Sequence, residues 1–150
     1  MSLRVPRLVR KLADVVWELP QTSLGALLLG SVVAARQVEG VRRARGRIFV
    51  RTKMGLGVSL GFFVFHSEHD SPFVPVGREN ADHEYGHALQ SRKLGPVYLP
   101  LVGVPSVMRV AYAVGNRIVR GRRWAGYYRG YPELQADKLG GVDCRLRPRP

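Results

Sequence analysis

The first part of the chain passes from a helical pattern of apolar residues to a continuous apolar run. Residues 1–20 place apolar side chains three or four positions apart with basic residues between them, which predicts an amphipathic basic helix ending near Pro20. Residues 22–35 are almost entirely apolar. As a helix this run would be about 21 Å long, short of the roughly 30 Å core of a bilayer. We therefore expect a buried or membrane-dipping helix rather than a cleaved signal sequence.

The pattern changes to that of strands after residue 46. Residues 47–51 alternate between polar and apolar side chains, and residues 58–65 are rich in β-branched and aromatic side chains. The glycine-containing segment 54–57 between them has the composition of a turn. A β-hairpin is the simplest interpretation. Residues 66–78 then form a polar loop with two prolines.

Two further helices are predicted in the second half of the chain. The first begins at Asn80 or Asp82, either of which can cap it, and ends near Leu94, because a glycine and a proline follow. The second covers residues 132–139, with a proline in its first turn and a glycine pair at its end.

A long apolar segment, residues 94–115, separates these two helices. It is long enough to cross a bilayer, but its three prolines and Arg109 favour a buried or interfacial element. Residues 116–129 are basic and aromatic. No repeat or linker divides the chain, so a single domain of class α+β is expected over residues 1–150. Its predicted parts are a basic and apolar helical extension (1–45), a core (46–142) and a tail (143–150).

Charge is distributed unevenly along this pattern. The chain has 24 basic and 11 acidic residues and a formal net charge of +13, and five acidic residues lie close together in residues 68–84. The excess of positive charge attracts anionic lipid or nucleic acid. A local acidic cluster in so basic a protein is typical of a cation site. Cys144 is the only cysteine, which excludes an intramolecular disulfide and a cysteine-based zinc site.

The acidic cluster contains the string His83-Glu84-x-x-His87, which falls within the predicted helix 80–94. Residues four apart share a face of a helix, so the two imidazoles can bind one zinc ion. Glu84 is one position off that face. It is expected to accept a proton from a water molecule at the metal rather than to bind the metal itself.

A third protein ligand must come from elsewhere in the chain. The extended motif, with a glycine three and a histidine six residues after His87, is absent, since Gln90 and Lys93 occupy those positions. Glu133 is the only later glutamate, and Asp137 follows it by one helical turn. We expect Glu133 to bind the metal and Asp137 to accept a hydrogen bond from the free ring nitrogen of a ligand histidine.

Several alternatives stay open for the site. Asp137 is a rival third ligand, and so are His66 and His69, although loop residues of this kind are more often solvated. A tyrosine hydroxyl can donate to an oxyanion beside the metal. The candidates, for which packing roles are also plausible, are Tyr127, Tyr128 and Tyr131.

Gly86 lies in the middle of the motif helix, where glycine costs about 1 kcal/mol relative to alanine. A closely approaching backbone would explain a glycine at this position. We expect that backbone to be the edge of the hairpin.

The motif with the later Glu133-Leu-Gln-Ala-Asp137 resembles the gluzincin pattern, HExxH followed by ExxAD. The longer string His83-Glu-Tyr-Gly-His-Ala-Leu-Gln-Ser-Arg92 and its continuation are similar to small bacterial zincin-like proteins. The resemblance covers roughly residues 56–142 and leaves the first 45 residues unmatched. It implies a zincin-like fold, with a small hairpin or sheet packed on the motif helix and on a C-terminal ligand helix. It also implies zinc held by His83, His87 and Glu133, with Glu84 as base.

The leading functional hypothesis is a zinc-dependent hydrolase, most simply a peptidase acting on a peptide or protein, in the cytoplasm or at the membrane of a bacterium. One alternative is a non-catalytic zinc protein at an anionic membrane surface. Another is a nucleic-acid-binding protein that uses residues 117–129, where bases would stack on aromatic side chains.

Overall fold

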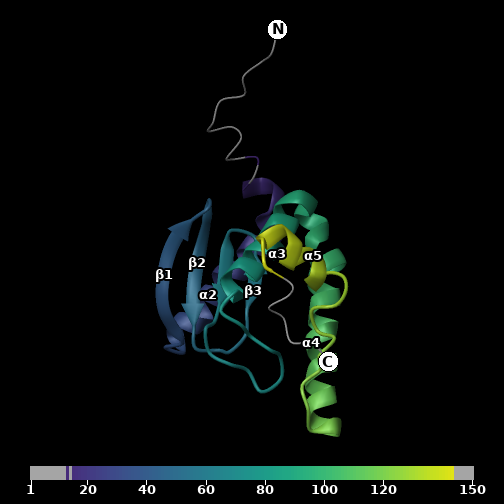
Figure 1. Cartoon of the computed structure of the whole chain (residues 1–150). Coiled ribbons are helices and arrows are strands. Elements are labelled where there is room, and N and C mark those ends of the chain that lie inside the picture. The colour runs from purple at the N-terminus through teal and green to yellow at the C-terminus, as the bar shows by residue number, and fades with distance from the viewer. Residues whose placement is uncertain (1–12, 14, 144–150) are drawn as a thin grey trace.

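The computed structural model describes residue 13 and residues 15–143, which fold around one mixed four-stranded sheet (Figure 1). The predicted α+β class is therefore confirmed. Most of the predicted helix 1–20 and most of the tail 143–150 lie outside the described residues. The elements, in chain order, are α2 (Leu19–Ala34), β1 (Val38–Ala44), β2 (Arg47–Thr52), β3 (Val58–Leu60), β4 (Phe63–His66), α3 (Asn80–Leu94), a 3-10 turn η1 (Gly95–Val97), a π turn η2 (Leu99–Gly103), α4 (Val104–Arg120) and α5 (Glu133–Gly140).

The strand order β1-β2-β4-β3 corrects the predicted hairpin between residues 47–51 and 58–65. β2 pairs in parallel with β4, and the two hairpins are β1-β2 and β3-β4. The segment 58–65 splits into two short strands because Gly61 turns the chain with a φ of 60°. The first hairpin turns at Arg45 and Gly46, which both have positive φ.

Strand β1 lies in the part of the chain that was predicted to be a helical extension, so residues 38–44 belong to the sheet and not to a helix. The strand is at the edge of the sheet and most of its side chains face solvent. Without a buried face it has no alternating apolar pattern, which is why the sequence did not reveal it. The predicted helix end near Pro20 falls close to a break in the helical backbone, because residues 15–17 are helical and Glu18 is in a turn. Pro20 itself lies in the first turn of α2, where its missing amide costs nothing.

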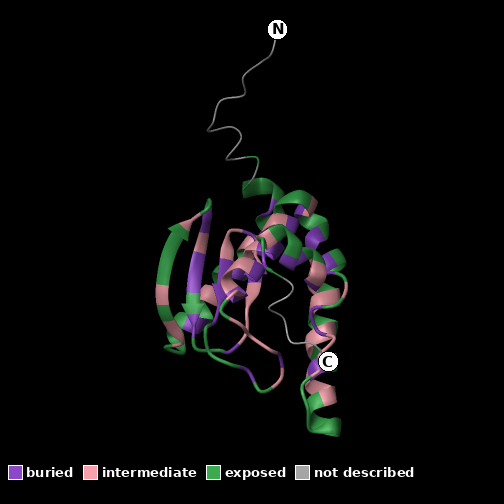
Figure 2. Cartoon of the chain, viewed as in Figure 1, coloured by how far each residue is buried: buried purple, intermediate pink, exposed green. Residues whose placement is uncertain are grey.

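Helices cover both faces of the sheet (Figures 1 and 2). Val50 and Phe65 point to one face and pack against Val32 of α2. Their strand neighbours Phe49 and Val64 point to the other face and pack against Ala88 of α3. The two central strands are thus buried on both faces. Their continuous runs of apolar residues agree with this, because a strand buried on both faces needs no alternation. The apolar run 22–35 forms most of α2, which packs one side on the sheet through Gly25 and Val32. Its other side, with Leu24, Leu27 and Val33, is exposed, so the expectation of a buried helix holds for one face only.

The helices α3 and α5 cross at glycines. A Cβ on Gly86 of α3 would overlap the carbonyl oxygen of Ala136 in α5, and a Cβ on Gly140 of α5 would overlap that of Asp82. The backbone close to Gly86 is therefore that of α5, and the expected contact with the hairpin edge is wrong. This contact is closer than two helices with larger side chains could make.

The segment 94–115 forms η1, η2 and the first part of α4. Arg109, which argued against a membrane span, donates hydrogen bonds to the carbonyl oxygens of Gly126 and Tyr127, and its guanidinium lies over the Trp124 ring. These contacts hold the aromatic loop between α4 and α5 (residues 121–132) against α4. Among the residues that the structure describes, no helix combines the length and the apolar character needed to cross a bilayer.

Candidate metal centre

Helix α3 carries His83 and His87 one turn apart on its buried face. The centroids of the two rings are 4.8 Å apart and the ring planes are nearly perpendicular. This is the arrangement expected from the four-residue spacing, because side chains at i and i+4 stand over the same face of a helix. Both imidazoles are turned towards α5.

Helix α3 begins at Asn80 and ends at Leu94, as predicted, but no side chain caps its first turn. Asn80 is already in the first turn, and its side-chain oxygen accepts a hydrogen bond from the amide of Ser67 at 2.9 Å. Glu79 occupies the cap position. The contact joins the polar loop to the first turn of α3, just ahead of the two histidines.

Glu133, in the first turn of α5, brings a carboxylate between the two imidazoles. Its Oε2 is 3.0 Å from Nε2 of His83 and 3.2 Å from Nε2 of His87. The three side chains are buried, and all their ligand atoms lie within 4.8 Å of one another. A tetrahedral zinc ion with bonds of about 2.0–2.1 Å separates its ligand atoms by roughly 3.3 Å, so the observed spacing suits such an ion.

The other ring nitrogen of each histidine also has a partner. Nδ1 of His83 is 2.7 Å from Oδ1 of Asp137, as expected for that carboxylate, and Nδ1 of His87 is 2.7 Å from Oε1 of Gln90. Because carboxylate and amide oxygens only accept, each Nδ1 is the donor and each Nε2 is directed at Glu133. Acceptors of this kind orient metal-binding histidines.

Two residues that hydrogen-bond to the candidate ligands were not predicted from the sequence. Gln90 is three residues after His87 on the same helix, and its amide nitrogen donates to the carbonyl oxygen of Pro132 and to Gln135. Ser106 of α4 donates a hydrogen bond of 2.6 Å to the second oxygen of Glu133. The three-residue spacing from His87 could have indicated that Gln90 lies beside this histidine on the helix. Ser106 reaches the site only through tertiary packing, so no local pattern could have indicated it.

The centre concentrates buried negative charge. Glu84, Glu133 and Asp137 are all buried, and Glu133 forms ion pairs with the two imidazoles. Burial raises the pKa of Glu133, but hydrogen bonds from His83 and His87 outweigh burial and hold that pKa well below its ordinary value. Burial of such charge is costly unless a cation compensates it.

His83 responds to the same charge. Burial would lower the pKa of its imidazole, but the hydrogen bonds to Asp137 and Glu133 outweigh burial and raise the pKa to about 9. An imidazole held between two carboxylates requires a positive charge at the site. Either a second proton or a metal ion on Nε2 supplies it.

Glu84 faces the neighbouring cavity rather than the convergent ligand atoms. Ser59 of β3 lies beside it, with Oγ 2.5 Å from the Glu84 carbonyl oxygen and 3.2 Å from Oε2. Gly57 leaves the space that the carboxylate fills, since a Cβ there would overlap Oε1 of Glu84. Burial raises the pKa of Glu84 above its ordinary value.

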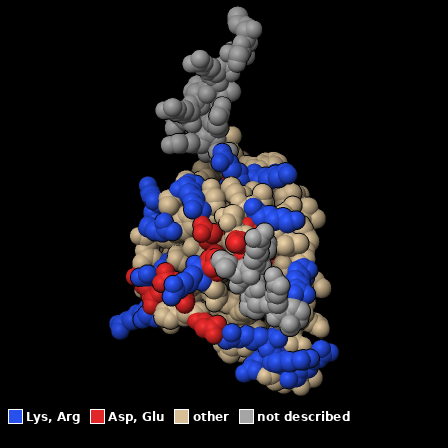
Figure 3. Space-filling model, in the orientation of Figure 1, with Lys and Arg blue, Asp and Glu red and all other residues tan. Residues whose placement is uncertain are grey.

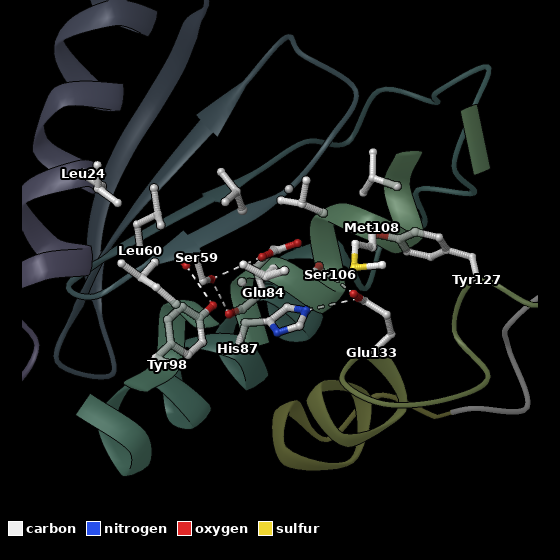
Figure 4. A pocket seen from close by; sticks show the side chains of 17 residues that line it. Leu24, Ser59, Leu60, Glu84, His87, Tyr98, Ser106, Met108, Tyr127 and Glu133 are labelled. Carbon is white, nitrogen blue, oxygen red and sulfur yellow. Dashed lines mark hydrogen bonds and ion pairs between the residues drawn. The ribbon is translucent and has the colours of Figure 1, made fainter. Parts of the chain in front are cut away.

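A cavity of about 600 Å³ reaches the centre between β3 and α4. Glu84, His87 and Glu133 project into it (Figure 4). The hydroxyl of Tyr98 also reaches this cavity and donates to the carbonyl oxygen of Ser59 at 3.0 Å. Its volume is in the range of small-ligand sites. The remaining walls are mostly apolar, and include Leu24, Val58, Leu60, Leu99, Val104, Val107, Met108 and Val110.

The structure separates the three candidate tyrosines. Tyr127 lines the cavity with Glu133, and burial raises the pKa of its phenol, which therefore keeps its proton. Tyr128 stacks edge-on against His83 and donates its hydroxyl hydrogen to the carbonyl oxygen of Pro75. Tyr131 is half exposed. Tyr127 is thus the one of the three that faces the cavity.

The rival histidines lie elsewhere. His66, at the end of β4, is buried edge-on against Phe49, and burial lowers the pKa of its imidazole. His69 is exposed and 2.9 Å from Glu39. Within the described part of the chain, the group able to hold a metal ion consists of His83, His87 and Glu133.

The centre thus combines three convergent ligand atoms, oriented imidazoles, an excess of buried carboxylate and an adjoining cavity that holds a further carboxylate. These features come from α3, α5, α4 and the β3 edge of the sheet. No protein family model, no curated protein and no solved structure matches the chain.

Proposed function

We propose that this protein is a zinc-dependent hydrolase that cleaves peptide bonds. The observation that carries the proposal is the convergence of two Nε2 atoms and one carboxylate oxygen within 4.8 Å, beside a cavity into which Glu84 projects. Two histidines and one glutamate with an open fourth position are the ligand set of catalytic zinc in several peptidases.

Each residue of the site has a separate role in the proposed reaction. Zinc held by His83, His87 and Glu133 would polarise a scissile carbonyl and acidify a water molecule. Glu84 accepts the proton of that water and returns it to the departing amine, which its raised pKa favours. The protonated phenol of Tyr127, which lines the same cavity, would donate to the oxyanion.

The sheet edge favours a peptide as the substrate. β3 is one of the two outer strands of the sheet, and Val58, Ser59 and Leu60 all line the cavity. An extended peptide can lie along an edge strand and use its backbone groups. We propose that β3, α3 and α5 together form a zincin-like arrangement, in which the strand holds the substrate and the helices hold the metal.

Metal content tests the first half of the proposal. After loading with zinc and removal of excess metal, the wild-type chain should retain one zinc ion by elemental analysis. His83→Ala and Glu133→Ala should lose it. His69→Ala is the matched control, because this histidine is exposed and paired with Glu39, and it should retain the ion.

Cleavage of a quenched-fluorescence peptide library tests the second half. Glu84→Gln should keep zinc and lose cleavage by about 10²–10⁴-fold, the usual contribution of a general base. A zinc-loaded wild-type chain that cleaves no peptide would refute the peptidase. A fully active Glu84→Gln variant would refute the assigned role of Glu84.

A further inference from the structure

Helix α4 is turned with its apolar face outward. Its large exposed apolar residues lie mostly three, four or seven positions apart, one or two turns of the helix, so they form one stripe along it. The opposite side carries the fully buried Ala113, with Arg109 and Ser106, which bond to other parts of the chain. The stripe, from 50% to 82% exposed and here called the α4 stripe, consists of Leu101 just ahead of the helix and Val104, Val107, Met108, Tyr112, Ile118 and Val119.

Helix α2 extends this surface across the mouth of the cavity. Leu24 and Leu27 are 44% and 69% exposed and one turn apart. Leu24 lines the same cavity as Val104, Val107 and Met108. Figure 4 shows Leu24 and Met108 on opposite sides of the opening. The exposed apolar surface is therefore continuous with the apolar wall of the cavity.

Basic residues accompany the α4 stripe. Arg117 and Arg120 are exposed in the last turn of α4, and Arg122 follows directly. Figure 3 shows one group of Lys and Arg side chains at the lower end of the molecule, where α4 ends in Figure 1, and others elsewhere on the same face. An outward apolar stripe with basic residues at its end is typical of a helix that lies at an anionic membrane surface.

The net charge argues against a second copy of the chain as the occupant of this surface. Each copy carries +13, so two copies would repel one another at close approach. An anionic bilayer instead offers negative charge to the arginines and an apolar phase to the α4 stripe.

We propose that the α4 stripe, with Leu24 and Leu27 of α2, docks on the surface of an anionic phospholipid bilayer. The cavity then opens towards the lipid. A consequence that rests on the proposed hydrolase is that its substrate presents an apolar segment at the membrane interface.

Vesicle sedimentation with the full chain tests the docking. The wild-type chain should bind vesicles of phosphatidylglycerol and phosphatidylcholine much better than vesicles of phosphatidylcholine alone, and added salt should weaken binding. The double variants Val107→Ser/Met108→Ser and Ile118→Ser/Val119→Ser should each bind about ten-fold more weakly, since each removes two exposed apolar side chains. Circular dichroism checks that they fold.

Val41→Ser is the matched control. Val41 is 59% exposed on β1, at the other edge of the sheet from α4 (Figure 1), and its substitution should leave binding unchanged. Equal binding by wild type and both double variants would overturn the proposal and assign binding to another part of the chain, such as the basic N-terminal residues. Failure of the wild type to bind would also overturn it. So would a lipid-free dimer, seen by sedimentation velocity, that the double variants dissociate.

The two proposals fail separately. Glu84→Gln should bind vesicles as the wild type does, because the α4 stripe does not include Glu84. A chain that cleaves soluble peptides but binds no vesicle keeps the hydrolase and loses the docking surface. A chain that binds vesicles but cleaves no peptide keeps the docking surface and loses the hydrolase.

Discussion

Gly86 of α3 lies against the carbonyl oxygen of Ala136 in α5, and this backbone contact sets the position of the third ligand. Ala136 is three residues after Glu133, so the same turn of α5 carries both the contact and the carboxylate. The distance between the two helices therefore decides whether Glu133 reaches Nε2 of His83 and His87.

Gly86→Ala should weaken both stability and zinc binding. The new Cβ overlaps the Ala136 carbonyl, which is backbone and cannot rotate away, so α5 must shift. Overpacking of this kind costs about 1–3 kcal/mol. Thermal unfolding measures the first effect and competition with a chelator measures the second. Gly30→Ala in α2 is the control, because nothing lies within 4 Å of a Cβ there, and alanine should stabilise that helix slightly. Unchanged zinc affinity in Gly86→Ala would show that the helix contact does not position Glu133.

Asp137→Asn should lower zinc affinity while leaving the ligands in place. The variant keeps an oxygen near Nδ1 of His83 but removes the charge that orients and polarises the imidazole. Loss of such a partner typically costs about 10–100-fold in metal affinity. A chelator titration measures it. Asp82→Asn serves as the control, because this aspartate forms an exposed ion pair with Arg45 and should leave affinity unchanged. Equal affinity in both variants would contradict the role given to Asp137.

A buried ion pair between Glu18 and Arg47 joins α2 to the sheet at 2.7 Å. Arg47 also donates to the carbonyl oxygens of Gly61 and Ala88, and Glu18 accepts from Ser91. Removing one partner of a buried pair costs about 3–5 kcal/mol, because the other charge is left without compensation.

Arg47→Met should therefore lower the free energy of unfolding by several kcal/mol, measured by urea denaturation. Arg51→Met, at a half-exposed arginine on the same strand, should change it by less than about 1 kcal/mol. The double variant Glu18→Gln/Arg47→Met should be more stable than the sum of the single effects predicts. Strict additivity would mean that the two charges do not interact.

The sequence predicted those parts of the site that depend on local geometry. The spacing of His83 and His87 places them on one helix face whatever the rest of the fold does, and the same holds for Glu133 and Asp137. Which helices cross, and where, depends on tertiary packing. The parallel pairing of β2 with β4, the reach of Ser106 to Glu133 and the ion pair of Glu18 with Arg47 therefore left no periodic signal. The glycine in mid-motif indicated a close backbone, but nothing local identified α5 as its source.

Zinc should remove the fall in stability with rising pH that is expected for the metal-free chain. In the metal-free chain the pKa of His83 is raised from 6.5 to about 9, because its contacts with Asp137 and Glu133 outweigh burial. The folded state thus holds this proton more tightly than the unfolded state. The resulting stabilisation is complete below pH 6.5 and is lost as the pH rises through 9.

Zinc competes for the same nitrogen and requires the neutral imidazole, so its affinity should rise over the same interval. The melting temperature of the metal-free chain should therefore fall between pH 6.5 and 9, and the increase in melting temperature caused by zinc should grow. Differential scanning calorimetry with and without a chelator measures both trends. His83→Gln should flatten the metal-free trend, because a glutamine side chain does not titrate. A metal-free melting temperature that rises over this interval would show that His83 is not held as an imidazolium between the two carboxylates.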